Sequence, residues 1–275
     1  MSSVDRSLRF GSRPRDDLGR PVELPGPPRR VVSLVPSLTE AITVTAPGVL
    51  VGATDWCVHP ADLSVQRVRG TKNPDLGRIV ELAPDLVVAN EEENRKPDVE
   101  ALRENGIAVW VTDVRSVDSA LTCLGRLLEV LGAPHRHWLA QARAAWAPQP
   151  QTLPSPSGPV RRTAVVAVWR RPWMWLGSDT YAGDVLRRVG VDNALAGHSQ
   201  RYPRIDPADL PDHELVVLPD EPYRFTVADG PEAVPDKAIA LVDGQALTWY
   251  GPRMIGALPM LRAALGQVTV EGNER

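Results

Sequence analysis

Several features that would point directly to a compartment or a partner are scarce in this chain of 275 residues. Its two cysteines, Cys57 and Cys123, do not suggest a disulfide framework. No apolar run approaches the roughly 18 residues that span a bilayer, and residues 1–30 lack the apolar core of a signal peptide. A net charge of -3 gives no argument for a nucleic-acid partner. The sequence therefore predicts a cytoplasmic protein with no membrane span and no nucleic-acid partner, or an extracytoplasmic one if its start is misassigned.

Motifs for catalysis and for metal binding are also missing. The chain has no nucleophile elbow, Walker loop or dinucleotide fingerprint. A zinc site needs three or four converging ligands, and no cysteine or histidine spacing matches one. We therefore expect no catalytic residues, no metal site and no required cofactor, which favours binding over turnover. The alternative is a cytosolic, hydrolase-type enzyme that uses two carboxylate clusters.

The aromatic residues are unevenly chosen, with two phenylalanines against eight tryptophans. Trp138 and Trp146 follow helical spacing and Trp110 ends a strand-like run, so these three are expected to pack in the interior. The other five lie at predicted strand ends or in loops: Trp56, Trp169, Trp173, Trp175 and Trp249. Large flat side chains there suit a flat macrocycle or a sugar ring, because stacking buries a large area at little entropic cost. The alternative is that half of them only cover the hydrophobic rim of a sheet.

Two stretches of the chain match each other. Residues 85–92 (DLVVANEE) and 214–221 (ELVVLPDE) both read as an acid, Leu-Val-Val, two neutral residues and two acids. A short unbroken apolar run is typical of a parallel strand that is buried on both faces. Open α/β sheets bind ligands beyond the carboxyl ends of such strands. The match indicates two similar α/β lobes, by duplication or by chance, each with a polar strand end.

Strand-like and helical patterns alternate along the chain, which favours a mostly parallel sheet. In the first half we expect strands over 31–35, 50–53, 86–89 and 107–111, and helices over 38–45, 76–82 and 99–105. A second α/β set is expected at 163–169, 182–189, 215–218 and 239–242, with a final helix near 254–265.

The middle of the chain separates these two sets. The longest helical tract runs from Ser116 to about Ala147 and breaks at residues 132–134, where Pro134 can start a second helix. A proline-rich stretch follows it. We predict an N-terminal α/β lobe over 1–131 with a hairpin around Gly19 at 16–24, a backbone helix over 132–150, a linker over 151–160 and a C-terminal α/β lobe over 161–275.

An ordered series of motifs runs through both halves. RVVSLVPSLTE (30–40), VGATDWC (51–57), GTKNPD (70–75) and LAPDLV (82–87) come first, and WMWLGSDTY (173–181), GVDNA (190–194), EPYRF (221–225) and DGQALTWYGPR (243–253) follow. The series covers residues 15–267 and resembles the cobalamin- and siderophore-type substrate-binding proteins of ABC importers, the helical-backbone receptors.

The resemblance implies a fold, a function and a site. It implies two Rossmann-like lobes joined by a single long backbone helix, a ligand cleft between them, and a monomer. The implied function is non-catalytic binding of a bulky metal chelate, which is a corrinoid such as cobalamin or a ferric siderophore or haem-like ligand. The expected ligand-binding residues are Pro36, Ser37, Asp55, Trp56, Lys72, Asn90, Glu91, Trp169, Arg170, Trp173, Tyr202, Glu221, Tyr223, Trp249, Tyr250 and Arg253.

Some charged residues allow more than one interpretation. Arg170 and Arg171 can pair with ligand carboxylates or phosphates, or can be solvated surface charge. Residues 91–93 are three glutamates that can bind a cation, anchor ligand amides, close the cleft against Arg170, or form a solvated face.

The chain departs from the family where its importers dock on their permease through one acidic residue per lobe. Gly77 and Ala208 occupy the inferred positions, so docking through paired acids is not expected. A cytosolic binder agrees best with these departures, and an importer component with a misassigned start is the further alternative.

Overall fold

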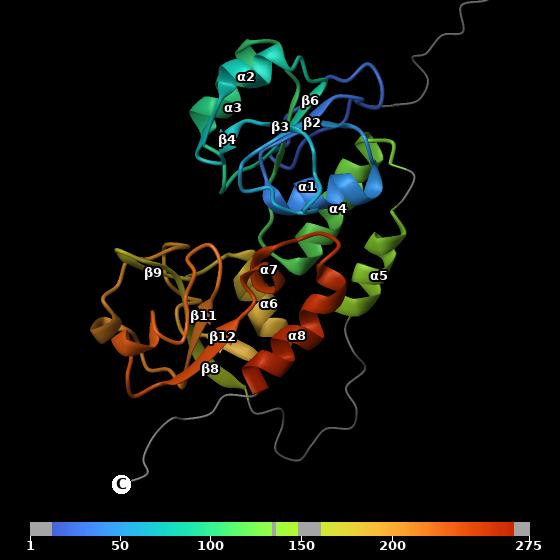
Figure 1. Cartoon of the computed structure of the whole chain (residues 1–275). Coiled ribbons are helices and arrows are strands. Elements are labelled where there is room, and N and C mark those ends of the chain that lie inside the picture. The colour runs from blue at the N-terminus through green and yellow to red at the C-terminus, as the bar shows by residue number, and fades with distance from the viewer. Residues whose placement is uncertain (1–12, 134–135, 148–160, 267–275) are drawn as a thin grey trace, which may run out of the picture. The chain divides into compact units, whose positions relative to one another are not determined.

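The computed structural model describes residues 13–133, 136–147 and 161–266, which form two compact units (Figure 1). Unit 1 takes the described residues up to Asp113 and Thr122–Leu139, and unit 2 takes Val114–Leu121 and the described residues from Ala140 onward. Each unit contains a parallel sheet with helices, so the predicted α/β fold is confirmed. The predicted linker over 151–160 lies outside the described residues.

The sheet of unit 1 has five parallel strands in the order β3-β2-β1-β6-β7. They are β1 (Val31–Ser33), β2 (Leu50–Ala53), β3 (Gln66–Arg67), β6 (Leu86–Asn90) and β7 (Val109–Thr112). Every residue of β1 and β6 is buried, as expected of strands that are covered on both faces. A small antiparallel pair, β4 (Arg69–Gly70) and β5 (Asn73–Pro74), lies beside the sheet.

Helices cover both faces of this sheet. Helices α2 (Leu76–Glu81) and α3 (Lys96–Glu104) lie on one face, and α1 (Pro36–Thr45) lies on the other (Figure 1). Ile79 of α2 and Leu102 of α3 are fully buried in the core that contains Val87 of β6. Proline at the start of α1 and α3 leaves fewer unpaired N–H groups there.

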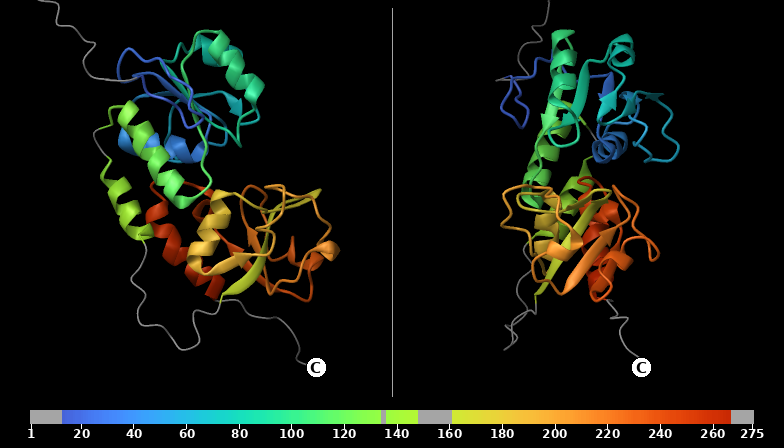
Figure 2. Two further views of the ribbon diagram at one scale, coloured as in Figure 1. Left: turned by 180° about the vertical axis from the view of Figure 1, so that it is seen from behind. Right: turned by 90° about the vertical axis from the view of Figure 1, so that its left-hand side faces the viewer.

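The main sheet of unit 2 has four parallel strands in the order β10-β8-β11-β12. They are β8 (Arg162–Arg170), β10 (Val191–Asn193), β11 (Leu215–Pro219) and β12 (Ala238–Val242), and β9 (Trp173–Trp175) pairs antiparallel with the end of β8. Helices α6 (Tyr181–Val189), α7 (Gly244–Thr248) and α8 (Met254–Gly266) lie on one face, and loops cover the other (Figure 2). Two short 3-10 turns, η2 (Pro207–Asp209) and η3 (Pro231–Ala233), belong to those loops.

The two sheets share one strand order. The order β2-β1-β6-β7 in unit 1 corresponds position by position to β10-β8-β11-β12 in unit 2. The matching octapeptides contain β6 and β11, which occupy equivalent places and are buried at every residue. This shared topology favours duplication over chance as the origin of the match.

Two helices occupy the segment between the two α/β sets. They are α4 (Val117–Val130) and α5 (His137–Trp146), separated at the predicted break. Each of these two helices has residues in both units. The predicted single backbone helix over 132–150 stays a prediction.

The tryptophans expected in the interior are buried. In unit 1, Trp138 donates from its indole N–H to Thr45 Oγ1 at 2.9 Å, and Trp110 lies in β7. In unit 2, Trp146 donates to the carbonyl of Met254 at 2.7 Å. The prediction that these three residues pack in the interior is confirmed.

The sequence did not predict β3, β4, β5, β9 or β10. Each has only two or three residues, too few for an apolar period to be visible. Near the start of the described residues, Arg15 and Pro21 form an isolated antiparallel bridge around Gly19, whose φ of 78 suits glycine. Asp16 beneath this turn is buried and pairs with Arg103 at 3.0 Å, which fastens the turn to α3.

Candidate ligand-binding site

In unit 1 the candidate residues lie in the segments that directly follow three neighbouring parallel strands, with Ser37 in the first turn of α1. Ser37 follows β1, Trp56 follows β2 and Glu91 follows β6. The carboxyl ends of parallel strands meet at one edge of a sheet, where ligands of open α/β folds bind. The order β2-β1-β6 therefore brings the start of α1 and the loops after β2 and β6 to one edge.

Hydrogen bonds from neighbouring side chains hold the loop that carries Trp56 in place. Cys57 is buried, and its sulfur lies 3.0 Å from Thr39 Oγ1 and 3.1 Å from Thr54 Oγ1. Burial raises the pKa of the Cys57 thiol, so it acts as a packed, neutral group. Arg67 donates to the carbonyls of Thr54 and Cys57 at 3.0 and 2.8 Å. This brace leaves the Trp56 side chain 66% exposed on a fixed backbone.

The loop after β6 is built around two asparagines. The side-chain oxygen of Asn90 accepts hydrogen bonds from the backbone N–H of Glu92 and Glu93 at 2.8 and 3.1 Å. Its amide nitrogen donates to Thr112, and Asn94 donates to the carbonyl of Thr71 at 2.9 Å. Asn90 is buried and holds the loop in shape. The contact between Asn90 and a ligand stays a prediction, and the burial of Asn90 does not favour it.

Two ionisable side chains of this edge influence each other. Burial raises the pKa of Glu93 to about 7, against the attraction of Lys72, which lowers it. Lys72 is exposed and donates to the backbone carbonyl of Glu92. The edge thus carries charges of both signs, with Asp55 and Glu91 exposed as well as Lys72.

In unit 2 the aromatic residues form a continuous row. Each ring contacts the next one in the order Trp175, Trp173, Phe225, Tyr223, Trp169. The distances between successive ring centroids are 5.2, 5.8, 4.7 and 5.5 Å. The last contact is edge-to-face, a favourable arrangement for aromatic pairs. Trp169 is 40% exposed at the outer end, while Trp175 is in the core. The indole of Trp169 is therefore exposed to solvent and is held in place by the aromatic rings packed behind it.

Arg170 has a role that the sequence did not indicate. It forms ion pairs with Asp229 and Glu232. Asp229 also accepts a hydrogen bond from the Tyr223 hydroxyl at 2.7 Å, and Glu232 accepts one from the Gly230 N–H at 2.7 Å. The guanidinium therefore clamps the 221–232 loop. These ion pairs do not favour a solvated surface charge, and pairing of Arg170 with a ligand stays a prediction.

The acidic end of β11 is also engaged within unit 2. Asp220 accepts from the Gly244 N–H at 2.7 Å, and Glu221 accepts from the Gln245 side chain at 2.8 Å. A Cβ on Gly244 would lie 2.6 Å from the Glu221 backbone nitrogen, so only glycine permits this close approach. Glu221, predicted to contact the ligand, is half-buried and helps to fasten α7.

The motif 249–253 is more deeply placed than its sequence indicates. Trp249 is 8% exposed and Tyr250 is buried, with its ring 5.7 Å from that of Tyr181. The Arg253 guanidinium lies 5.5 Å from the centre of the Trp249 ring, a cation–π contact. The expectation that Trp249 is an accessible anchor, removable without loss of stability, is therefore wrong, because its side chain belongs to the interior.

The remaining predicted residues differ in exposure. Asp55 is exposed, and Pro36 and Tyr202 are half-buried. Ser37 is buried, and its hydroxyl has no hydrogen-bond partner among the described residues. Asp229, Glu232 and Gln245 were missed, since no sequence pattern links them to residues tens of positions away.

Comparison with known proteins identifies the family. Residues 31–210, which are well over half of the chain, match the periplasmic binding proteins. The chain belongs to this family. The vitamin B12-binding protein of Salmonella choleraesuis (strain SC-B67) is 26% identical over 192 residues, 64% of this chain and 66% of that protein. The match thus spans just under two thirds of the length of this curated relative.

Solved structures share the fold. The periplasmic heme-binding protein RhuT from Roseiflexus sp. RS-1 has a TM-score of 0.65 at 19% identity, over 86% of this chain and 97% of that one. Helicobacter pylori CeuE with Ni(II) bound has a TM-score of 0.72 at 14% identity, over 92% of this chain and 88% of that one. At these identities the likeness shows the architecture, and the resemblance inferred from the motifs is confirmed.

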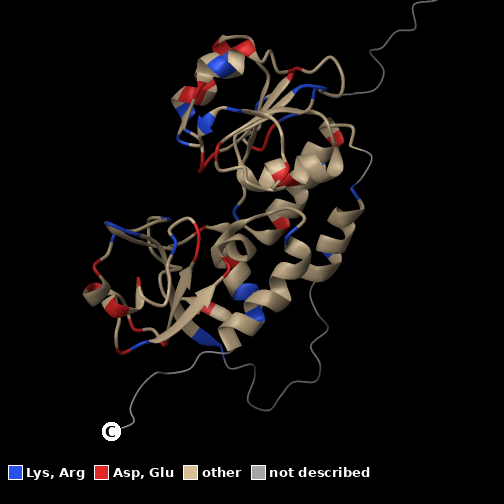
Figure 3. Ribbon diagram, viewed as in Figure 1, with Lys and Arg blue, Asp and Glu red and all other residues tan. Residues whose placement is uncertain are grey.

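Three of the expected absences concern membranes, metals and nucleic acids. None of the helices that the structure describes combines the length and apolar character needed to cross a membrane. Within residues 13–133, 136–147 and 161–266, no three His, Cys, Asp or Glu side chains gather as metal ligands do. In the view of Figure 3, basic and acidic residues are intermixed along the ribbon of each unit.

We predict that Glu93→Gln stabilises the protein at high pH. The folded-state pKa of about 7 lies above the usual 4.5, so the folded state holds the proton more tightly and stability falls as pH rises from about 4.5 to 7. Glutamine cannot ionise, so the variant should be more stable than wild type at pH 8 by about 1–3 kcal/mol. The advantage should vanish near pH 4. Urea unfolding at both pH values measures it.

Glu91→Gln is the control for this experiment, because it removes the same charge from an exposed side chain of the same loop. An equal stability difference at pH 4 and pH 8 in Glu93→Gln would contradict the assignment of a buried, ionising carboxyl.

We further predict that Arg170→Gln loosens the 221–232 loop. Loss of both ion pairs should cost about 1–3 kcal/mol and change the near-ultraviolet circular dichroism, because Tyr223 and Trp169 lose their fixed packing. Arg171→Gln is the matched control, since Arg171 is an exposed neighbour. A double-mutant cycle with Asp229→Asn measures the coupling. Additive effects of the two substitutions would rule out the clamp.

Proposed function

We propose that this chain is a non-catalytic receptor for a bulky metal chelate, with a corrinoid as the first candidate and a ferric siderophore or haem-like chelate as the next. The observation that carries the proposal is membership of the periplasmic binding protein family together with a relative named as a vitamin B12-binding protein. The shared fold with a heme-binding protein supports the second ligand class.

Each unit, taken by itself, supplies a surface suited to a flat ligand. Trp56 of unit 1 is exposed on a backbone that Arg67 and Cys57 brace, and Trp169 of unit 2 is exposed at the end of the aromatic row. A fixed aromatic side chain loses little entropy when a ring stacks on it. These two indoles are the strongest candidates for ligand contact.

Polar groups next to Trp56 would provide orientation. Lys72 and Asp55 are exposed at the same edge, and Glu91 begins the loop after β6. A corrinoid periphery rich in amide groups offers both donors and acceptors to such a set. The hydrolase-type alternative lacks a comparable observation, since the family consists of binding proteins.

The family also bears on location. Its members are described as periplasmic, which supports the extracytoplasmic alternative rather than the cytoplasmic expectation, and supports a role as an importer component. We propose that any docking on a permease does not use acids at the two inferred positions. Gly77 and Ala208 are exposed, while nearby Asp75 and Asp206 accept backbone hydrogen bonds as caps of α2 and η2.

Ligand titration tests the proposed function. We expect cobalamin or cobinamide to quench tryptophan fluorescence saturably at micromolar concentration, because a ligand stacked on an indole accepts its excitation. Haemin and ferric siderophores are titrated in parallel, with ligand absorbance as a second signal. No saturable change with any of these chelates would refute the proposal, and release of product from a panel of esters or glycosides would support the enzyme alternative.

Two tryptophan variants separate binding from folding. Trp56→Ala should weaken chelate binding by about 1–3 kcal/mol, as for a stacked anchor, with no change in unfolding. Trp249→Ala should instead destabilise the protein by about 3–5 kcal/mol, because it removes a buried indole. Fluorescence titration and urea unfolding of both variants measure the two effects. Unchanged affinity in folded Trp56→Ala would remove Trp56 from the site.

A further inference from the structure

An arginine outside the set of predicted contact residues holds the loop that presents Trp56. Arg67 is the last residue of β3. Its Nη1 donates to the carbonyl oxygens of Thr54 and Cys57 at 3.0 and 2.8 Å, and its Nη2 donates to that of Leu63 at 3.3 Å. Nη1 carries two hydrogens, so the first two bonds use both of its donors. One guanidinium therefore joins three carbonyls of the loop, two of which flank Trp56.

The β4–β5 hairpin contacts the indole itself. The backbone N–H of Asp55 donates to the carbonyl of Arg69 at 2.9 Å, which joins the loop to the hairpin one residue before Trp56. A Cβ built on Gly70 would lie 3.4 Å from the indole nitrogen of Trp56 and 2.5 Å from Asn73 Oδ1. The nitrogen edge of the indole thus lies against a stretch of backbone without a side chain.

The hairpin is in turn fastened to the loop after β6. Asn94, which is buried, donates to the carbonyl of Thr71 at 2.9 Å. The Lys72 ammonium donates to the carbonyl of Glu92. The indole therefore lies against a hairpin that two side-chain hydrogen bonds hold, while Arg67 holds the backbone that carries the indole.

This double restraint matters because the indole is exposed. Trp56 is 66% exposed, so packing in the interior does not fix its orientation. When only a fraction of the molecules hold a group in the binding-competent pose, the apparent dissociation constant rises by the inverse of that fraction. A residue that raises this fraction strengthens binding without touching the ligand.

We infer that Arg67 is a positioning residue of the chelate site, which holds the backbone on both sides of Trp56 and so keeps the indole in the pose that stacks on a flat ligand. This role rests on the proposed function, because it concerns the same site. The effect of Arg67 on affinity passes through Trp56 and not through its charge, since its donors are directed to carbonyls of the loop.

Nuclear relaxation in the ligand-free chain tests the positioning step. In protein labelled with nitrogen-15 tryptophan, the indole signal of Trp56 is the one that Trp56→Phe removes. We expect a heteronuclear NOE typical of a rigid group in the wild type and a lower value in Arg67→Gln and in Arg67→Lys, because lysine keeps the charge but lacks the planar fork. The remaining indole signals should keep their values, which a general loss of structure would change. A mobile Trp56 indole in the wild type, or an equally rigid one in both variants, would overturn the inference.

Titration of the same variants with cobinamide and with haemin tests the effect on binding. Each Arg67 variant should bind about tenfold more weakly than the wild type. Arg69→Gln is the matched control, because it removes the same charge from an exposed side chain that pairs with Asp75 at 3.6 Å. Wild-type affinity in folded Arg67→Gln, or in Arg67→Lys alone, would show that the fork does not position the indole.

A double-mutant cycle identifies the route of the effect. Arg67→Gln should weaken binding in the wild type but cause no further loss in Trp56→Ala. Equal losses in the two backgrounds would indicate that Arg67 contacts the ligand directly, and would contradict positioning. If neither chelate binds the wild type, the proposed function fails, while the relaxation measurements on the ligand-free chain still decide whether Arg67 positions Trp56. Circular dichroism checks that each variant is folded.

Discussion

Burial of the central parallel strands on both faces is the constraint on which the rest of this structure depends. β6 and β11 hydrogen-bond to a neighbour on each side and have no exposed residue. Such strands can carry almost no polar side chains along their length, because a buried polar group without a partner is costly. The groups that can meet a ligand are therefore confined to the loops at the strand ends.

These loops are exposed and are also held in place by side-chain interactions. The interactions differ between the two units. Unit 1 uses hydrogen bonds to the backbone, in which Asn90 and the Arg67 guanidinium hold the loops around an exposed indole. Unit 2 uses charge, in which Arg170 joins Asp229 and Glu232 beneath Tyr223. In both units, residues that were predicted to contact a ligand, such as Asn90 and Arg170, hold a loop in place. A polar residue near a candidate site can therefore serve to hold a loop in place.

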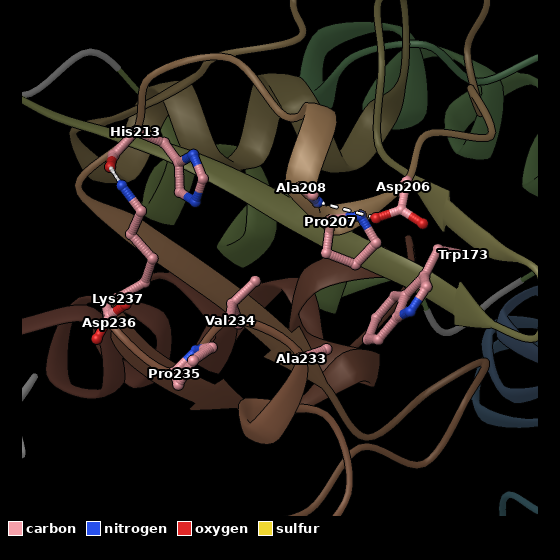
Figure 4. Close-up of a pocket in the computed structure, with 10 residues that line it drawn as sticks. All are labelled: Trp173, Asp206, Pro207, Ala208, His213, Ala233, Val234, Pro235, Asp236 and Lys237. Carbon is pink, nitrogen blue, oxygen red and sulfur yellow. Dashed lines mark hydrogen bonds between the residues drawn. The ribbon is translucent and has the colours of Figure 1, made fainter.

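The two faces of the unit 2 sheet are also covered by different kinds of structure. Helices α6, α7 and α8 cover one face with regular packing. The loops on the other face pack aromatic residues around Trp175 and Phe225 but meet less regularly at the amino edge, where a pocket of about 400 Å³ lies between the segments that contain η2 and η3 (Figure 4). A duplicated strand order therefore does not lead to duplicated surfaces, since the loops and not the strands decide where a cavity forms.

The sequence by itself determined the α/β class, the positions of the longer strands and helices, the interior tryptophans and the family. These depend on local periodicity and on motifs that are continuous in the chain, such as the runs at 31–35, 86–89 and 215–218. The tertiary structure decided which candidate residues are accessible. Trp56 and Trp249 look alike in sequence, yet one is 66% and the other 8% exposed. Only the structure brought Arg170 to Asp229 and left His213 Nε2 without a partner. Burial and ion pairing between distant residues depend on how separate elements pack, and no local pattern encodes that packing.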